Sequence, residues 1–224
     1  MRSGWRTTVV CGVGCVLFLG GEVRAGELRG RVEVRNHISG REENPGIAYG
    51  HGGAFEKPEP KPVFTEAQNV IIYAEGRDTI AHAPPRHHPQ MVQRAKTFIP
   101  PVLPVLVGTT VDFPNEDKIY HNVFSLTRTK KFDLGRYPTG ASKSVTFDKP
   151  GVVKVYCEIH KDMVAYIMVL KTPFFAVPEP DGAFALQDLP SGHYRVHVWH
   201  PALPLQVQDV FIPVSGGPEI RFVL

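Results

Sequence analysis

The chain has 224 residues, of which 42% are hydrophobic and 21% are charged, and its formal net charge is +3 at pH 7. This length exceeds one typical domain and is sufficient to bury a sizeable hydrophobic core. The small net charge, without a long basic run, argues against a dedicated nucleic-acid-binding protein. Glycine and proline, 21 residues each, separate short apolar segments, which is typical of an all-β protein.

Residues 1–25 have the pattern of a secretory signal peptide. Arg2 and Arg6 provide a basic start, Thr7–Gly21 is a short apolar run, and Ala25 ends an acceptable small-residue cleavage site. The run is shorter than the about 20 residues that span a bilayer comfortably. We therefore expect cleavage after Ala25 and a periplasmic or secreted product without stable membrane insertion. An uncleaved anchor is the alternative.

The cysteines support an exported metal protein. Cys11 and Cys15 lie inside the apolar run, so the mature chain keeps only Cys157. An exported protein with one cysteine cannot form an internal disulfide, and a lone thiol in an oxidising compartment needs a reason to be there. A bond to a metal would supply that reason.

The first part of the mature chain offers two strands. Leu28–Arg35 alternates between apolar and charged residues, which predicts a half-buried strand. Arg41–Glu66, rich in glycine, proline and charge, reads as a long loop. Asn69–Ala74 is the second expected strand, and Ala83–Pro89 is a stiff polar connector that marks a domain boundary.

Residues 90–171 carry a series of short apolar segments. Gly108, Asn115-Glu116-Asp117 and Asp148-Lys149-Pro150-Gly151 are turn signals between them. Six to eight short strands in about 80 residues fit a small Greek-key sandwich. Strands are expected at Lys96–Ile99, Val105–Phe113, His121–Leu126, Lys131–Leu134, Ser144–Phe147 and on both sides of Cys157.

The C-terminal part returns to longer alternating segments. Asp181-Gly182 predicts a hairpin turn, His193–Trp199 alternates, and Ile220–Leu224 is the last expected strand. Two strands before residue 90 are too few for an independent sandwich. We therefore expect residues 26–86 and 172–224 to form one discontinuous β-sandwich, into which the domain of residues 90–171 is inserted.

The candidate site lies in Val152–Val169, where an apolar strand leads to a turn and a second apolar strand. The turn contains Cys157, His160 and Met163, in the spacing Cys-x2-His-x2-Met. A thiolate, an imidazole and a thioether are ligands of a blue-copper site, which has two His and one Cys in a trigonal plane and a weak axial Met.

The missing second imidazole has to come from elsewhere in the chain. His121, in the segment FPNEDKIYHNVFS, is the obvious candidate. Strand alternation places Cys157 on the same face as Val153 and Val155, so its thiol should point into the interior. A buried cysteine that merely packs is the alternative interpretation.

At His121-Asn122-Val123 and Cys157-x2-His160-x2-Met163 the chain resembles the cupredoxins, the small blue copper proteins. The short ligand loop is most similar to that of amicyanins, although Ile159 stands where amicyanins have Pro. The resemblance implies a mononuclear type 1 copper ligated by His121, Cys157, His160 and Met163. It further implies that Asn122 is the amide that ties the two ligand-bearing segments together.

The flanking segments resemble the carboxypeptidase regulatory-like, or transthyretin-like, β-sandwich. The residues that carry this resemblance are Gly30-Arg31-Val32, Asp181-Gly182-Ala183-Phe184 and Leu189-Pro190-Ser191-Gly192-His193-Tyr194. The whole combination is similar to bacterial proteins often labelled "methylamine utilisation protein". The expected fold is thus all-β, with a Greek-key cupredoxin sandwich inserted into a second sandwich.

The expected function is transfer of single electrons between unidentified redox proteins by one type 1 copper. A dinuclear copper centre would need a second cysteine four residues after Cys157, where the chain has Lys161. An enzyme is not expected, because the His-x-His pairs of multicopper oxidases are absent. Copper delivery or storage, and a carbohydrate- or protein-binding module with a structural metal, are the alternatives.

His51, His87, His88, His193 and His197 are not expected to bind the metal. His51 lies in a glycine-rich loop, and His87 and His88 are neighbours whose side chains point apart on an extended chain. His193 and His197 are four residues apart on a strand, about 13 Å, which one metal cannot bridge.

Overall fold

The structure is a computed structural model that describes residues 26–35, 60–76, 82–214 and 217–224. The expected signal peptide and His51 lie outside these residues. The described residues form strands, connecting loops and one 3-10 helix, η1 (Glu66–Asn69). No helix in this part of the chain is long and apolar enough to cross a membrane. The expectation of an all-β protein with several sheets is confirmed.

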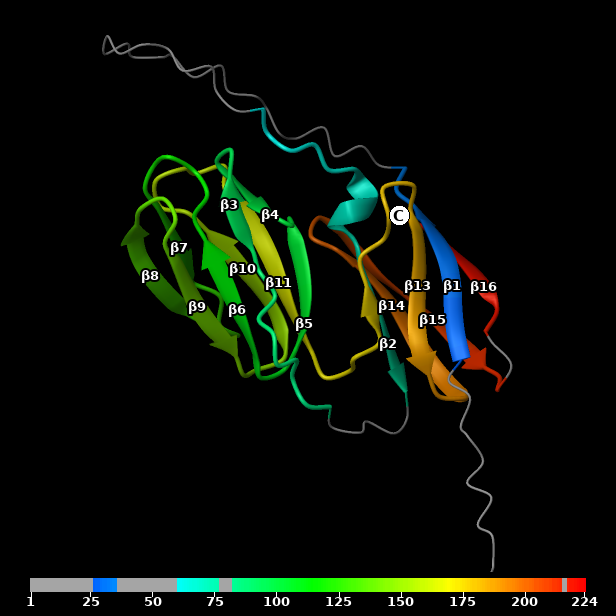
Figure 1. The fold of residues 1–224 in the computed structure, drawn as a ribbon. Helices are drawn as coiled ribbons and strands as arrows, with labels where there is room; N and C mark the ends of the chain where they lie inside the picture. Colours follow the sequence, from blue (N-terminus) through cyan, green and yellow to red (C-terminus); the bar gives the residue numbers. More distant parts are fainter. Residues whose placement is uncertain (1–25, 36–59, 77–81, 215–216) are drawn as a thin grey trace, which may run out of the picture.

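The middle of the chain forms the group of green to yellow strands, β3 to β11, on the left of Figure 1. A five-stranded sheet has the order β5-β11-β10-β7-β8, and β6 pairs with β9 and β3 with β4 in smaller sheets. The strands are β3 (Val92–Arg94), β4 (Thr97–Ile99), β5 (Val102–Leu106), β6 (Thr109–Pro114), β7 (His121–Ser125), β8 (Phe132–Tyr137), β9 (Ser142–Phe147), β10 (Gly151–Tyr156) and β11 (Val164–Leu170).

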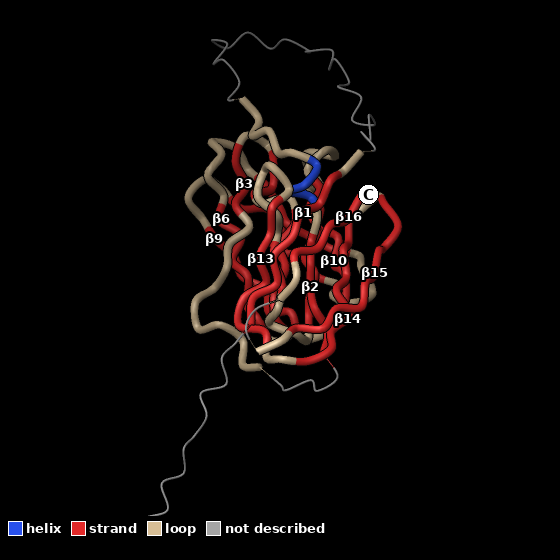
Figure 2. The backbone as a smooth tube through the Cα atoms, turned by 90° about the vertical axis from the view of Figure 1, so that its right-hand side faces the viewer, coloured by secondary structure: helices blue, strands red, loops and turns tan. Residues whose placement is uncertain are grey.

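The two ends of the described chain come together in the second group of strands (Figures 1 and 2). One sheet has the order β13-β1-β16 and the other the order β12-β2-β14-β15. The strands are β1 (Gly26–Glu33), β2 (Ile71–Gly76), β12 (Phe175–Ala176), β13 (Ala183–Leu189), β14 (Gly192–His200), β15 (Leu203–Ile212) and β16 (Glu219–Val223).

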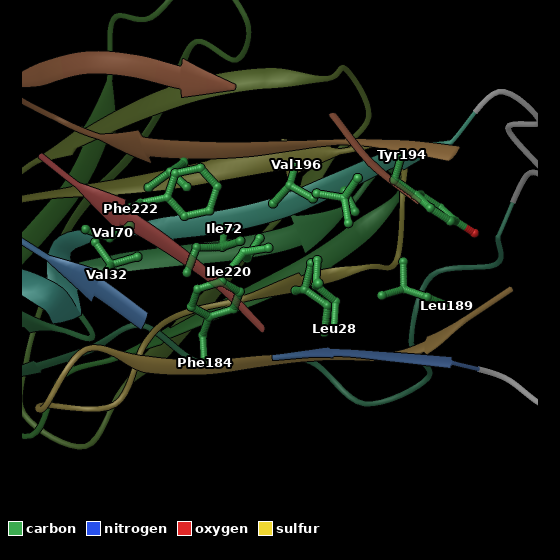
Figure 3. Packing of buried hydrophobic residues seen from close by; sticks show 14 of the residues in the cluster. Leu28, Val32, Val70, Ile72, Phe184, Leu189, Tyr194, Val196, Ile220 and Phe222 are labelled. Carbon is green, nitrogen blue, oxygen red and sulfur yellow. The ribbon is translucent and has the colours of Figure 1, made fainter. Parts of the chain in front are cut away.

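Alternation along these strands explains how the second group closes around a core. Leu28 and Val32 of β1 are buried, whereas Arg29 and Arg31 between them are exposed. Figure 3 shows Leu28 and Val32 among side chains that come from both sheets. Full burial of one such aliphatic side chain stabilises a fold by about 1.5–3 kcal/mol. Segments from both ends of the chain therefore share one core.

A third cluster of apolar residues connects the two groups. Its buried members are Ile71, Val102, Met168 and Leu170. β11 can contribute to it because its Ala165, Ile167 and Val169 face the core of the middle group while Met168 and Leu170 face the other way. The rings of Tyr166 and Trp199 also meet edge to face, with centroids 5.7 Å apart. The five-stranded sheet is thus packed on both faces at β5 and β11.

Some strand bounds differ from those predicted. β1 begins at Gly26, and Asn69 ends the 3-10 helix instead of starting a strand. β15 was not predicted at all. Its apolar Leu205, Val207 and Phe211 are about half exposed, and Val210 and Ile212 of the opposite phase are buried. With apolar residues on both faces, the segment lacks the period of two that identifies a half-buried strand.

A glycine at the turn before β13 provides a test of how the two ends of the chain are joined. Gly182 has φ +85°, and a Cβ at this position would overlap the carbonyl oxygen of Val32. Gly140 has a similar φ of +75° but no atom near a Cβ. We expect Gly182→Ala to lower the free energy of unfolding by about 2 kcal/mol more than Gly140→Ala, because overlap is added to backbone strain.

Chemical denaturation of both variants measures this difference. An equal loss of stability in the two variants would show that β1 does not hold the Gly182 turn.

Candidate metal centre

Three neighbouring strands bring the predicted ligands to one end of the five-stranded sheet. His121 is the first residue of β7, Cys157 directly follows β10, and Met163 directly precedes β11. β10 pairs with both β7 and β11 in antiparallel register, so the start of these two strands lies beside its end. The turn itself is closed by two backbone hydrogen bonds, Cys157 N–H to Met163 O (3.2 Å) and Met163 N–H to His160 O (3.0 Å).

The donor atoms of His121, Cys157 and His160 converge. The Cys157 Sγ atom lies 3.7 Å from His121 Nδ1 and 3.9 Å from His160 Nδ1, and the two Nδ1 atoms are 3.1 Å apart. They form the one group of three or more His, Cys, Asp or Glu side chains with ligand spacing that the described residues contain. Residues 121 and 157 are thereby joined across 36 positions of sequence.

This spacing fits a metal ion at the centre of the three atoms. Protein-bound zinc lies about 2.0 Å from imidazole nitrogen and about 2.3 Å from thiolate sulfur. With bonds of this length in a trigonal plane, nitrogen and sulfur would be about 3.7 Å apart and the two nitrogens about 3.5 Å apart. The observed separations are close to these values, so the residues present fit a trigonal His2Cys metal site.

Met163 lies in the same interior. Its side chain is 1% exposed and belongs to the same buried apolar cluster as Cys157. The four predicted ligands therefore gather at the same end of the sheet, and Met163 is buried there. Its role as a weak axial ligand stays a prediction.

Asp117 is a residue of the site that sequence reasoning missed. Its Oδ2 lies 2.7 Å from His121 Nε2, and the carboxylate also accepts hydrogen bonds from the backbone N–H groups of Ala95 (2.6 Å) and Lys96 (2.8 Å). A carboxylate on one ring nitrogen holds the proton there and leaves the other nitrogen free to bind a metal. The sequence signal that could have identified Asp117 is an acidic residue four positions before a candidate ligand, in a segment that was interpreted only as a turn.

The electrostatics favour a thiolate in this pocket. Burial alone would raise the pKa of Cys157, but the His121 ring and the backbone N–H groups of Asn122, His160 and Ile159 lower it below the usual value. Burial would likewise lower the pKa of His121, but Cys157 and Asp117 raise it. Burial and the charge of His121 lower the pKa of His160. Metal binding requires a thiolate and neutral imidazoles, so the lowered pKa values of Cys157 and His160 favour it, whereas His121 has to release a proton when a metal binds.

Asn122 connects the two segments that carry the ligands. Its Oδ1 accepts a hydrogen bond from the backbone N–H of Glu158 (2.6 Å), and its Nδ2 donates to Asp133 Oδ1 (3.2 Å). The side chain is 2% exposed. β7 is thereby held to the ligand loop one residue after His121 and one residue after Cys157.

The other histidines that the structure describes lie outside this cluster. His88 Nδ1 is 2.9 Å from Asp112 Oδ1, and His193 is exposed beside the ring of Phe211. His197 and His200 are buried, each within 3.4 Å of a glutamate oxygen. None of them belongs to a group of three possible metal ligands in the described residues.

Comparison with known proteins gives partial similarities to copper proteins of solved structure. No protein-family model matches the chain. No curated protein sequence matches it either. A purple cupredoxin from Nitrosopumilus maritimus is 29% identical, with a TM-score of 0.34, over 37% of this chain and 99% of its own. A reduced amicyanin variant is 20% identical, with a TM-score of 0.36, over 44% of this chain and 99% of its own.

A copper-containing nitrite reductase from Thermus scotoductus SA-01 is 27% identical, with a TM-score of 0.38, over 44% of this chain. The match spans 26% of the nitrite reductase, so most of that enzyme has no counterpart in the match.

Proposed function

We propose that the chain is an exported type 1 copper protein that carries single electrons between redox proteins. The observation that carries this proposal is the convergence of Cys157 Sγ, His121 Nδ1 and His160 Nδ1 within 4.8 Å of one another. Two imidazoles and one thiolate with a nearby thioether are the donor set of a blue-copper site. The similarity to a purple cupredoxin and to amicyanin agrees with this reading.

The chain's residues would keep the site rigid during electron transfer. Bound copper would supply a one-electron Cu(II)/Cu(I) couple, for which this mixed donor set is a compromise between the two oxidation states. Asp117 fixes the His121 ring, and Asn122 fixes the loop after Cys157. His121 is fully buried and Cys157 is 4% exposed, whereas His160 is partly exposed. An electron would therefore enter or leave most directly at the His160 edge.

Titration of the apoprotein with Cu(II), followed by optical and EPR spectroscopy, tests the proposal. We expect one copper per chain, an intense thiolate-to-copper band and reversible reduction. A colourless product with an ordinary tetragonal copper spectrum would contradict it. A coloured site that cannot be cycled would favour copper delivery or storage.

We further propose the domain organisation predicted from the sequence, with residues 90–171 inserted between residues 26–86 and 172–224. Two observations support it. The apolar cluster of the middle group is drawn only from residues 91–169. β1 pairs with β13 and β16, and β2 with β12 and β14. Separate expression of residues 90–171 is the test, because an inserted domain should fold and take up copper alone.

Export is proposed from the sequence of residues 1–25. The intact mass of the natively produced protein checks it, since cleavage after Ala25 removes 25 residues. A mature chain that begins at Met1 would contradict it. No enzymatic role and no nucleic-acid partner are proposed.

Substitution of the thioether should change the redox potential without removing the colour. We expect Met163→Leu to keep the thiolate band and raise the potential, because the weak axial donor that favours Cu(II) is lost. Leucine is of similar volume, so the buried position should cost less than about 1.5 kcal/mol of stability. Spectroelectrochemical titration measures the thiolate band and the redox potential. An unchanged potential would show that Met163 does not contact the metal.

A further inference from the structure

Positive charge is concentrated at the end of the middle group that lies opposite the candidate metal centre. β9 and β11 end there, and β10 begins there and runs towards Cys157 (Figure 1). Four segments meet at this end, namely residues 107–108, 126–131, 148–150 and 171–172. Their charged side chains are five cations and one carboxylate: Arg128, Lys130, Lys131, Lys149 and Lys171 against Asp148.

Contacts between the segments hold these cations together in space. Lys130 Nζ lies 3.0 Å from Asp148 Oδ1, which joins the loop after β7 to the turn before β10. Thr127 Oγ1 accepts a hydrogen bond from the backbone N–H of Lys154 (3.0 Å), and the backbone N–H of Gly108 donates to the last residue of β9 (2.7 Å). Cations that are scattered over the sequence therefore form one surface, which we call the basic end.

Most of the charge of the basic end is exposed and uncompensated. Arg128, Lys131, Lys149 and Lys171 are exposed, and in the part of the chain that the structure describes no carboxylate lies within ion-pair distance of them. The pair of Lys130 and Asp148 cancels locally, so the four other cations set the sign of the surface. Leu126, in the same loop as Arg128, is 67% exposed. The basic end is thus a cationic surface with a single large apolar side chain.

The composition of the basic end fits an anionic lipid surface better than a protein partner. Four of its five cations are lysines, and none of the four segments contains an aromatic residue. Protein interfaces are depleted in lysine and enriched in aromatic residues, because their centres are dehydrated and closely packed. Lysine and arginine beside an anionic bilayer are attracted to its phosphate headgroups without any need for a complementary shape.

We propose that the basic end binds reversibly to the phosphate headgroups of an anionic bilayer, with Leu126 entering the headgroup region. Each cation adds electrostatic attraction, and the leucine adds buried apolar area. β10 extends for six residues from the basic end to Tyr156, next to Cys157. At about 3.3 Å per residue, a bound chain would hold the candidate metal centre about 20 Å above the headgroups, facing water. The binding uses no ligand of the metal, so it does not depend on the proposed copper chemistry.

Cosedimentation of the natively produced apoprotein with lipid vesicles tests the proposal. We expect binding to vesicles of equal parts phosphatidylcholine and phosphatidylglycerol, and at least tenfold weaker binding to phosphatidylcholine alone. Binding to the anionic vesicles should weaken steeply as salt is added, because exposed charges are screened. Equal binding to both kinds of vesicle, or no binding to the anionic ones at low salt, would overturn the proposal.

Charge-neutralising variants locate the lipid contact. The test variant combines Arg128→Gln, Lys131→Gln and Lys149→Gln. Its affinity for the anionic vesicles should fall on the order of 100-fold at low salt, since each cation near the surface contributes independently. The matched control removes the same formal charge from exposed positions of the β13-β1-β16 sheet, by Arg29→Gln, Arg31→Gln and Arg221→Gln. An equal loss in the control would show that only net charge matters and would overturn the proposal.

Replacement of the exposed leucine separates the apolar contribution from the electrostatic one. Leu126→Gln should weaken binding several-fold and leave its salt dependence unchanged, because only apolar area is lost. Hydrogen exchange gives the orientation of the bound chain. Amides of residues 126–131 and 148–150 should gain protection on the vesicles, whereas those of residues 157–163 should not. Protection of residues 157–163 instead, or binding of the basic end to an acidic protein without binding to vesicles, would overturn the proposal.

Discussion

Replacement of Cys157 by serine is expected to abolish the intense colour of the copper-loaded protein. The colour of a type 1 site arises from charge transfer between a thiolate and copper, and a serine hydroxyl is a hard donor that stays protonated. In this chain the environment of Cys157 already lowers the pKa of the thiol, through the His121 ring and three backbone N–H groups. The side chain is 4% exposed, so a serine there would be buried in an apolar cluster.

Copper affinity should fall with the colour, because the thiolate is the one anionic ligand of the proposed set. Absorption and EPR spectra of the copper-loaded variant provide the measurement. His193→Ala, which removes an exposed imidazole, is the control and should leave the spectra unchanged. A blue Cys157→Ser protein would show that the thiolate assignment is wrong, since Cys157 is the only cysteine after residue 25.

The clustering of the four candidate ligands was predictable because three of them are local in sequence. Cys157, His160 and Met163 share one turn, and the alternation of β10 fixes the side to which Cys157 points. His121 was predicted from its residue type and from the pattern of the segment around it. The antiparallel pairing of β7 with β10 explains why this histidine lies at the turn. Asp117 could not be identified in the same way, because its contacts with Ala95 and Lys96 are set by the turn between β3 and β4.

The all-β class was predictable from short apolar runs and turn signals, but the contact between the two groups of strands was not. Met168 and Leu170 are apolar residues of an apolar strand, and nothing in their pattern says that they pack against Ile71 instead of facing the neighbouring core. Such long-range placements follow from tertiary packing, which period and propensity do not encode.

Asp117→Asn is expected to lower copper affinity by roughly 10–100-fold, as for other residues that orient a metal-binding histidine. The carboxylate accepts from His121 Nε2, Lys96 N–H and Ala95 N–H, and an amide replaces one accepting oxygen with a donor. At least one of these contacts would then be lost, and the His121 ring would be held less firmly. Without the carboxylate charge beside its Nε2 atom, the His121 ring would also be a weaker electron donor to Cu(II). The redox potential should therefore rise.

Competition with a chelator of known affinity measures the first effect, and spectroelectrochemical titration measures the second. Glu116→Gln is the matched control, because it removes the same charge from the neighbouring residue, which is exposed and pairs with Arg94. Affinity and potential should stay close to those of the native protein in this control. If Asp117→Asn and Glu116→Gln shifted both quantities equally, the effect would be one of general charge, and the hydrogen bond between Asp117 and His121 would not be what positions the ligand.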